Sequence, residues 1–114
     1  MSNTSSGHRA EIVAANYLEM RGFSILELNW RRPMCEVDII ARKDKVIYFV
    51  EVKYRKNDHQ GSGFDYINPA KLSKMERGAR MWVEESRHQG EYQLSAIEVA
   101  GPTYVVEHFI ENAF

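Results

Sequence analysis

The stretch Val46-Ile47-Tyr48-Phe49-Val50-Glu51-Val52-Lys53 is an unbroken run of β-branched and aromatic residues that ends in a carboxylate and an ammonium group. Successive side chains on a strand point to opposite faces, so the odd-numbered residues would share one face and the even-numbered residues the other. Both faces are apolar, which predicts a central strand covered by helices on both sides. Glu51 and Lys53 are costly to bury there unless they are paired or bind a metal.

The rest of the chain supplies the partners that a central strand needs. Apolar residues at helical spacing predict a first helix from Ala10 to Arg21, capped by Gly22, and a second from Asn68-Pro69 to Gly90. Further strands are expected at residues 23–29, 35–41, 92–99 and 104–110. We therefore expect one α/β domain over residues 1–114, a five-stranded mixed sheet flanked by helices, with residues 1–6 disordered and residues 56–67 forming a mobile loop.

Bulk composition narrows the class of protein. The chain has 114 residues, a formal net charge of −1 and a single cysteine, Cys35. Because the total charge is not basic, any binding of nucleic acid would have to depend on local clusters of basic residues. One cysteine excludes an internal disulfide, and no run approaches the roughly 20 apolar residues of a membrane span. We expect a cytoplasmic protein that does not enter a membrane.

Four charged residues are predicted to meet at one end of a central hairpin. Glu36 and Asp38 lie two apart near the start of the second strand, and Glu51 and Lys53 lie two apart near the end of the third. Antiparallel order brings these two ends together. The sequence therefore predicts an acidic cluster with one lysine, away from the turn.

The hairpin loop decides whether the two pairs share a face. A loop of two residues pairs Lys43 with Val46, and any even-length loop places Asp38 on the side of Glu51. An odd-length loop without a bulge would place the two carboxylates on opposite faces. The functional interpretation therefore requires an even loop.

Two interpretations of this cluster stay open. Two carboxylates about 4 Å apart repel by roughly 4 kcal/mol at an effective dielectric of 20, and a bound divalent cation would offset that repulsion. Oxygen ligands without histidine or thiolate suit Mg²⁺ or Mn²⁺. Alternatively, Asp38 or Glu51 forms a salt bridge with Lys53, which would satisfy the charges without any catalysis.

Asp38 followed after twelve residues by Glu51-Val52-Lys53 resembles the Asp…Glu-x-Lys core of the PD-(D/E)XK nuclease superfamily. A wider pattern resembles the YraN-like family, which is predicted to be endonuclease-like and is similar in fold to the archaeal Holliday junction resolvases. That pattern comprises Gly7-His8-x-Ala10-Glu11, Tyr17-Leu18, Gly22-Phe23, Asn29-x-Arg31, Glu36-Val37-Asp38-Ile39-Ile40-Ala41, Phe49 to Lys53 with Arg55, and Asn112-Ala113-Phe114. Cys35 departs from it, because the family usually has glycine before the Glu-x-Asp.

The resemblance implies a restriction-endonuclease-like core and a metal-dependent nuclease site. Asp38, Glu51 and the Val52 carbonyl would hold Mg²⁺ or Mn²⁺, with Glu11 as a ligand through water and Glu36 as a further candidate. Lys53 would orient or deprotonate the attacking water. The implied catalytic residues are Asp38, Glu51, Lys53 and Glu11.

Local basic residues could contact the phosphates of a nucleic acid, and DNA is the expected partner. The candidates are Arg31, Arg55, Lys71 and Lys74, although a solvated helix face explains the two lysines about as well. A binding module that kept the fold but lost turnover, or a structural protein that needs neither metal nor nucleic acid, are the alternatives. By analogy with junction resolvases, a homodimer is also expected.

Overall fold

The helices and strands follow one another in the predicted order, and the computed structural model describes residues 5–56 and 68–113. Most of the segment expected to form a mobile loop, and residues 1–4 of the expected disordered lead, lie outside the described residues. The elements are α1 (Ser5–Met20), β1 (Ser24–Arg32), β2 (Cys35–Lys43), β3 (Val46–Arg55), α2 (Pro69–Ser86), β4 (Tyr92–Ala100) and β5 (Val105–Ile110).

Three predicted boundaries need correction. Helix α1 begins at Ser5 rather than near Ala10. Strand β1 continues to Arg32 instead of ending at residue 29, because Trp30 is buried against α2. Helix α2 ends at Ser86, before Gly90, since Arg87 adopts a left-handed conformation with φ of 61° and its N–H bonds back to the last turn.

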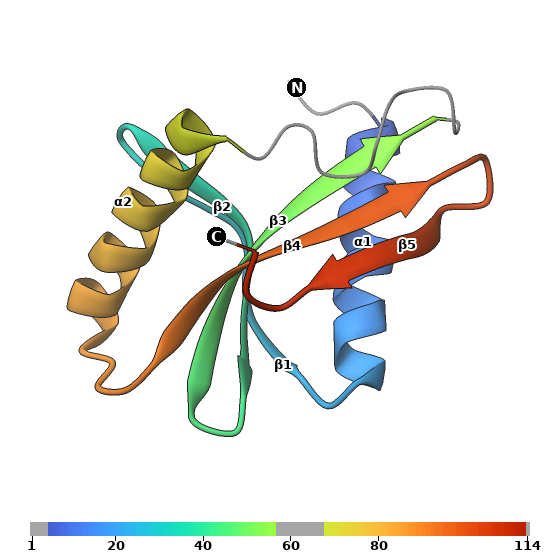
Figure 1. Cartoon of the computed structure of the whole chain (residues 1–114). Coiled ribbons are helices and arrows are strands. Elements are labelled where there is room, and N and C mark those ends of the chain that lie inside the picture. Colours follow the sequence, from blue (N-terminus) through green and yellow to red (C-terminus); the bar gives the residue numbers. More distant parts are fainter. Residues whose placement is uncertain (1–4, 57–67, 114) are drawn as a thin grey trace.

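The strands form one mixed sheet in the order β1-β2-β3-β4-β5. Neighbouring strands are antiparallel except β3 and β4, which are parallel and joined through α2. Strand β3 therefore lies at the centre of the sheet (Figure 1), as its two apolar faces predicted. The single α/β domain with a five-stranded mixed sheet and two helices is confirmed.

The two faces of the sheet carry separate hydrophobic cores. Ala14 and Leu18 of α1 pack against Tyr48 and Val50 of β3 and against the inner strands around them. On the other face, α2 packs against the alternate residues of β3, with Phe49 edge-to-face against Trp82. The predicted division of β3 into two apolar faces is thus confirmed.

The sheet forks between β2 and β3. Pairing of these strands begins at Lys43 and Val46, beside the two-residue turn, and ends at Ile39 and Val50. Beyond that point β2 stays paired with β1 as far as Cys35, while β3 stays paired with β4 as far as Arg55. The β1–β2 limb then bends toward α2 and the β3–β4 limb continues over α1 (Figure 1).

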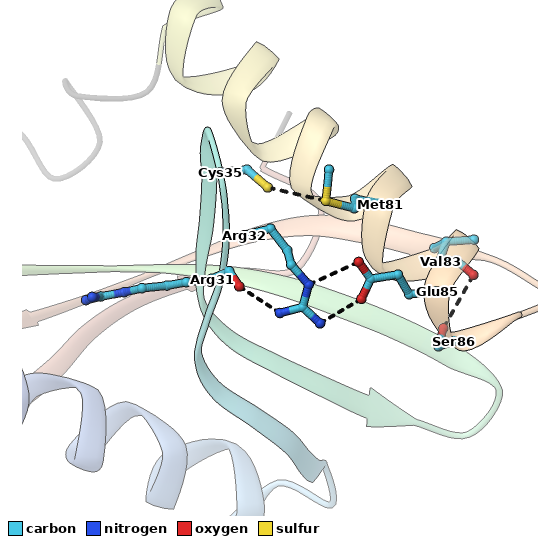
Figure 2. A network of polar contacts seen from close by, with 7 residues as sticks. All are labelled: Arg31, Arg32, Cys35, Met81, Val83, Glu85 and Ser86. Atoms are coloured by element: carbon cyan, nitrogen blue, oxygen red, sulfur yellow. Dashed lines mark hydrogen bonds and ion pairs between the residues drawn. The ribbon is translucent and has the colours of Figure 1, made fainter.

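Helix α2 contacts the β1–β2 limb at its middle and near its C-terminal end. The Asn68 side chain caps its first turn, and Gly78 lies so close to β2 that a Cβ there would be 3.0 Å from Val37 Cγ2. Near its end, Figure 2 shows Arg32 of β1 forming two parallel bonds to Glu85, of 3.0 and 2.7 Å. In the described ranges, no helix is long and apolar enough to cross a membrane.

Candidate functional site

Asp38 lies at the point where the sheet forks. It is the first residue of β2 beyond the last pair with β3, and extending the register by one position places it opposite Glu51. Its Oδ2 accepts a hydrogen bond of 2.8 Å from the main-chain N–H of Val52. The carboxylate thus takes the place of a main-chain carbonyl and links β2 to β3 just beyond the last main-chain pair between the two strands.

The side chain of Asp38 enters the fork because the alternation of β2 breaks there. Val37 and Ile40 both pack in the core beneath α2, although regular alternation would place them on opposite faces. The two-residue hairpin loop is the even-length loop that the prediction required, and the pair Lys43 with Val46 is confirmed. The even length of the hairpin loop therefore predicts correctly which residues of β2 and β3 are neighbours. The break in the alternation of β2 sets the direction of the Asp38 side chain.

A cavity of about 670 Å³ opens at the fork, and acids from three elements line it. Glu11 comes from α1, Glu36 and Asp38 come from β2, and Glu51 comes from β3 together with Val52. Residues from both helix-bearing faces reach one cavity because the strands have separated. The predicted acidic residues Asp38, Glu51, Glu11 and Glu36 are thus brought together.

Burial and like charge both disfavour ionisation of Asp38. Removal from water is the larger cause and the carboxylate of Glu51 the second, and together they raise the pKa of Asp38 from an ordinary 3.8 to about 8. Glu11 and Glu36 raise this pKa further, while the Val52 N–H opposes the change. Glu11 Oε1 is itself buried and lacks a hydrogen-bond partner among the described residues. The hydrogen bonds within the cavity therefore do not stabilise all of its carboxylate groups in their charged form.

Basic residues of α2 form the opposite wall. Lys71, Lys74 and Arg77 line the cavity at three-residue steps along the helix. Lys71 forms an ion pair with Glu51, with 2.9 Å between Nζ and Oε2. From the sequence, Lys71 was predicted only as a phosphate contact. Its ion pair with Glu51 was not predicted, because the two residues are far apart in the chain.

Lys53 and Arg55 follow Glu51 and Val52 on β3, near Glu98 of β4. Lys53 is half-buried on β3 beside Glu98 of β4, and it is not among the residues that line the cavity. Arg55 forms an ion pair with Glu98, and the two side chains are only 12% and 4% exposed. The role of Lys53 stays a prediction, and Arg55 is engaged inside the fold.

Arg31 lies at the margin of the cavity, where it forms an ion pair with Glu36. Its guanidinium lies 3.5 Å from Glu36, and both side chains are about half exposed. Figure 2 shows Arg31 extending away from α2, in the direction opposite to Arg32. Of the four predicted phosphate contacts, Lys71 and Lys74 therefore line the cavity, Arg31 lies at its margin, and Arg55 is buried in an ion pair.

The donors that meet at the fork suit a metal that takes few protein ligands. Within residues 5–56 and 68–113, no group of three or more His, Cys, Asp or Glu side chains is arranged to hold a metal. Asp38 and Glu51 do come together, with Val52 beside them. One or two carboxylates completed by waters and substrate phosphate is the donor set typical of Mg²⁺, so the residues present fit that ion.

Comparison with known sequences agrees with the resemblance. The sequence profile of uncharacterised protein family UPF0102 matches residues 10–100. The chain belongs to UPF0102. A UPF0102 protein of Sulfurihydrogenibium sp. (strain YO3AOP1) is 37% identical over 115 residues, covering 100% of this chain and 97% of the relative. One of Vibrio parahaemolyticus serotype O3:K6 is 38% identical over 86 residues, covering 75% and 71%.

Membership in UPF0102 confirms the YraN-like part of the resemblance. The matched residues include every acid at the fork and the three basic residues of α2.

Proposed function

We propose that this UPF0102 protein is a Mg²⁺- or Mn²⁺-dependent nuclease of the PD-(D/E)XK type, with a restriction-endonuclease-like core, that binds DNA and hydrolyses its phosphodiester bonds. The observation that carries the proposal is the convergence of Asp38 and Glu51 at the fork, in a cavity whose other wall is basic. A raised Asp38 pKa of about 8 supports it, since a cation would relieve the repulsion that burial enforces.

The residues of the chain divide into two groups in this proposal. Asp38, Glu51 and the Val52 carbonyl would hold the ion, with Glu11 reaching it through water. The chemistry that bound Mg²⁺ supplies is stabilisation of charge on the phosphate and activation of the attacking water. Lys53, at the end of β3, would orient that water.

The basic wall would hold the substrate. Lys74 and Arg77 project from α2 into the same cavity as the acids, so they can contact phosphates that flank the scissile one. Such contacts position a nucleic acid without reading its sequence. Four-way junctions are the first substrate to test, and a homodimer would match their two-fold symmetry.

One observation favours a second candidate, a module that binds nucleic acid without cutting it. Lys53 is not among the cavity-lining residues, whereas Lys71 forms an ion pair with Glu51. Binding needs only the basic wall, whereas cleavage needs an ammonium or water correctly placed at the phosphate.

A cleavage and binding panel separates these candidates. The chain would be incubated with Mg²⁺ or Mn²⁺ and offered duplex, single-stranded and four-way-junction DNA as well as RNA, with Asp38→Asn as the matched variant. We expect cutting that EDTA and Asp38→Asn both abolish. Binding without metal-dependent cutting would leave the module, and failure to bind any of the four would refute both candidates. Sedimentation at micromolar concentration would test the dimer, and a strict monomer would remove the resolvase analogy.

A further inference from the structure

Lys71 forms an ion pair with the Glu51 carboxylate, which is also a ligand of the proposed metal ion. Its Nζ lies 2.9 Å from Glu51 Oε2, and the Lys71 and Glu51 side chains are 33% and 16% exposed. Its backbone is fixed, because the Asn68 side chain accepts a 3.0 Å hydrogen bond from the Lys71 N–H in the first turn of α2. The position of the ion pair is therefore set by the fold, while the long side chain stays able to move.

Charge balance makes this pair unusual for a simple surface salt bridge. Four carboxylates line the cavity, and Lys71 contacts one of them, Glu51, directly. An ammonium that bonds Glu51 Oε2 and a cation that is coordinated by the same oxygen compete for it. A divalent ion beside Asp38 and Glu51 would also repel the ammonium.

We propose that the Lys71 ammonium pairs with the Glu51 carboxylate until a divalent ion binds there and displaces it. The released ammonium then contacts a phosphate of the bound nucleic acid. This proposal rests on the proposed function and deepens it by making the phosphate contact of Lys71 depend on the bound metal ion. The released side chain has an anionic target within its own cavity, beside the positions that Lys74 and Arg77 would occupy on the nucleic acid. Metal binding and phosphate binding are thus coupled through one side chain.

Two neutral variants, Lys71→Met and Lys71→Gln, test the competition directly, with Lys74→Met as the matched control. Lys74 lies one turn further along α2 and lines the same cavity, and its removal subtracts the same charge. Calorimetric titration of the folded proteins with MnCl₂ is the measurement. Loss of this competing, mostly buried ion pair should tighten Mn²⁺ binding by about fivefold in both Lys71 variants. Lys74→Met should stay within about twofold of the wild type.

The release step has its own readout, which does not depend on cleavage. A four-way DNA junction with a nuclease-resistant phosphorothioate backbone would be titrated with and without Mn²⁺. Lys71→Met should weaken junction binding with Mn²⁺ present and change it little without Mn²⁺, because Lys71 is then tied to Glu51. Lys74→Met should weaken binding equally in both conditions.

The outcomes distinguish this inference from the function on which it rests. If Mn²⁺ binds the wild type but binds the Lys71 variants equally or more weakly, the inference is wrong and the metal site stands. If Mn²⁺ binds the wild type nowhere, or the junction does not bind, the metal-dependent function fails together with the inference. A loss of junction affinity in Lys71→Met that is the same with and without Mn²⁺ would refute the release step alone.

Discussion

Replacing Asp38 with Asn should stabilise the metal-free protein at alkaline pH. Well below its ordinary pKa of 3.8, the carboxyl of Asp38 is protonated in both the folded and the unfolded chain. Between its ordinary pKa of 3.8 and its folded pKa of about 8, the unfolded chain loses the proton and the folded chain keeps it. The free energy of unfolding therefore falls as the pH rises through this window, and the loss is complete above the folded pKa.

The size of this loss follows from the two pKa values. At about 1.4 kcal/mol for each pKa unit, the difference sets an upper bound of about 6 kcal/mol. Asp38 lines an open cavity, so water that enters the cavity will solvate part of its charge, and we expect roughly 2 kcal/mol in practice. Asn keeps the oxygen that accepts from the Val52 N–H and removes the charge.

Urea denaturation in EDTA at pH 4 and pH 8.5 measures the effect. At pH 4 the free energies of unfolding of Asp38→Asn and the wild type should differ by less than about 1 kcal/mol, and at pH 8.5 the variant should be the more stable by about 2 kcal/mol. Asp44→Asn is the matched control, because Asp44 is an exposed turn residue of the same hairpin with φ of 58°, a conformation that Asn tolerates. If Asp38→Asn were the less stable protein at pH 8.5, ionised Asp38 would be held in a favourable salt bridge and the argument for a cation site would fall.

Three further changes test other parts of the structure. Lys53→Ala should lower turnover at least tenfold while leaving Mn²⁺ affinity unchanged, and a matched fall in calorimetric affinity would contradict that role. Arg55→Ala should cost about 3 kcal/mol in urea denaturation, because it leaves Glu98 buried without its guanidinium; a cost under about 1 kcal/mol would show that His108, 3.7 Å from Glu98, compensates. Gly78→Val should cost about 1–3 kcal/mol, since the added atoms meet Val37 of β2; an unchanged midpoint would mean that α2 can move away from the sheet.

The fold was largely predictable because local patterns and long-range packing agree in the centre of the chain. The apolar faces of β3 specify burial on both sides, and the short turn at Asp44 and Lys45 fixes an even register with β2. Register and antiparallel order were then sufficient to place Asp38 opposite Glu51. Boundaries were less predictable, since the end of β1 depends on Trp30 packing against a helix that lies far away in the sequence.

The fork could not be predicted from residue patterns. Val37, Ile39 and Ile40 are all apolar, so either face of β2 can be buried on either side of Asp38, and periodicity gives no sign that the alternation breaks. The ion pairs of Lys71 with Glu51 and of Arg55 with Glu98 were missed for a related reason. Each joins residues that only the packed arrangement of strands and helix brings together.

The branch point of the sheet also determines how motion would reach the two acids. Asp38 is one residue beyond the last pair with β3, whereas Met34, at the tip of the β1–β2 hairpin, is five residues beyond it. With about 3.3 Å of rise for each residue, a swing of that limb about the branch point would move Asp38 by roughly one-fifth of the displacement at the tip. A movement of the hairpin and the attached α2 about this point would therefore leave the separation of Asp38 from Glu51 nearly constant.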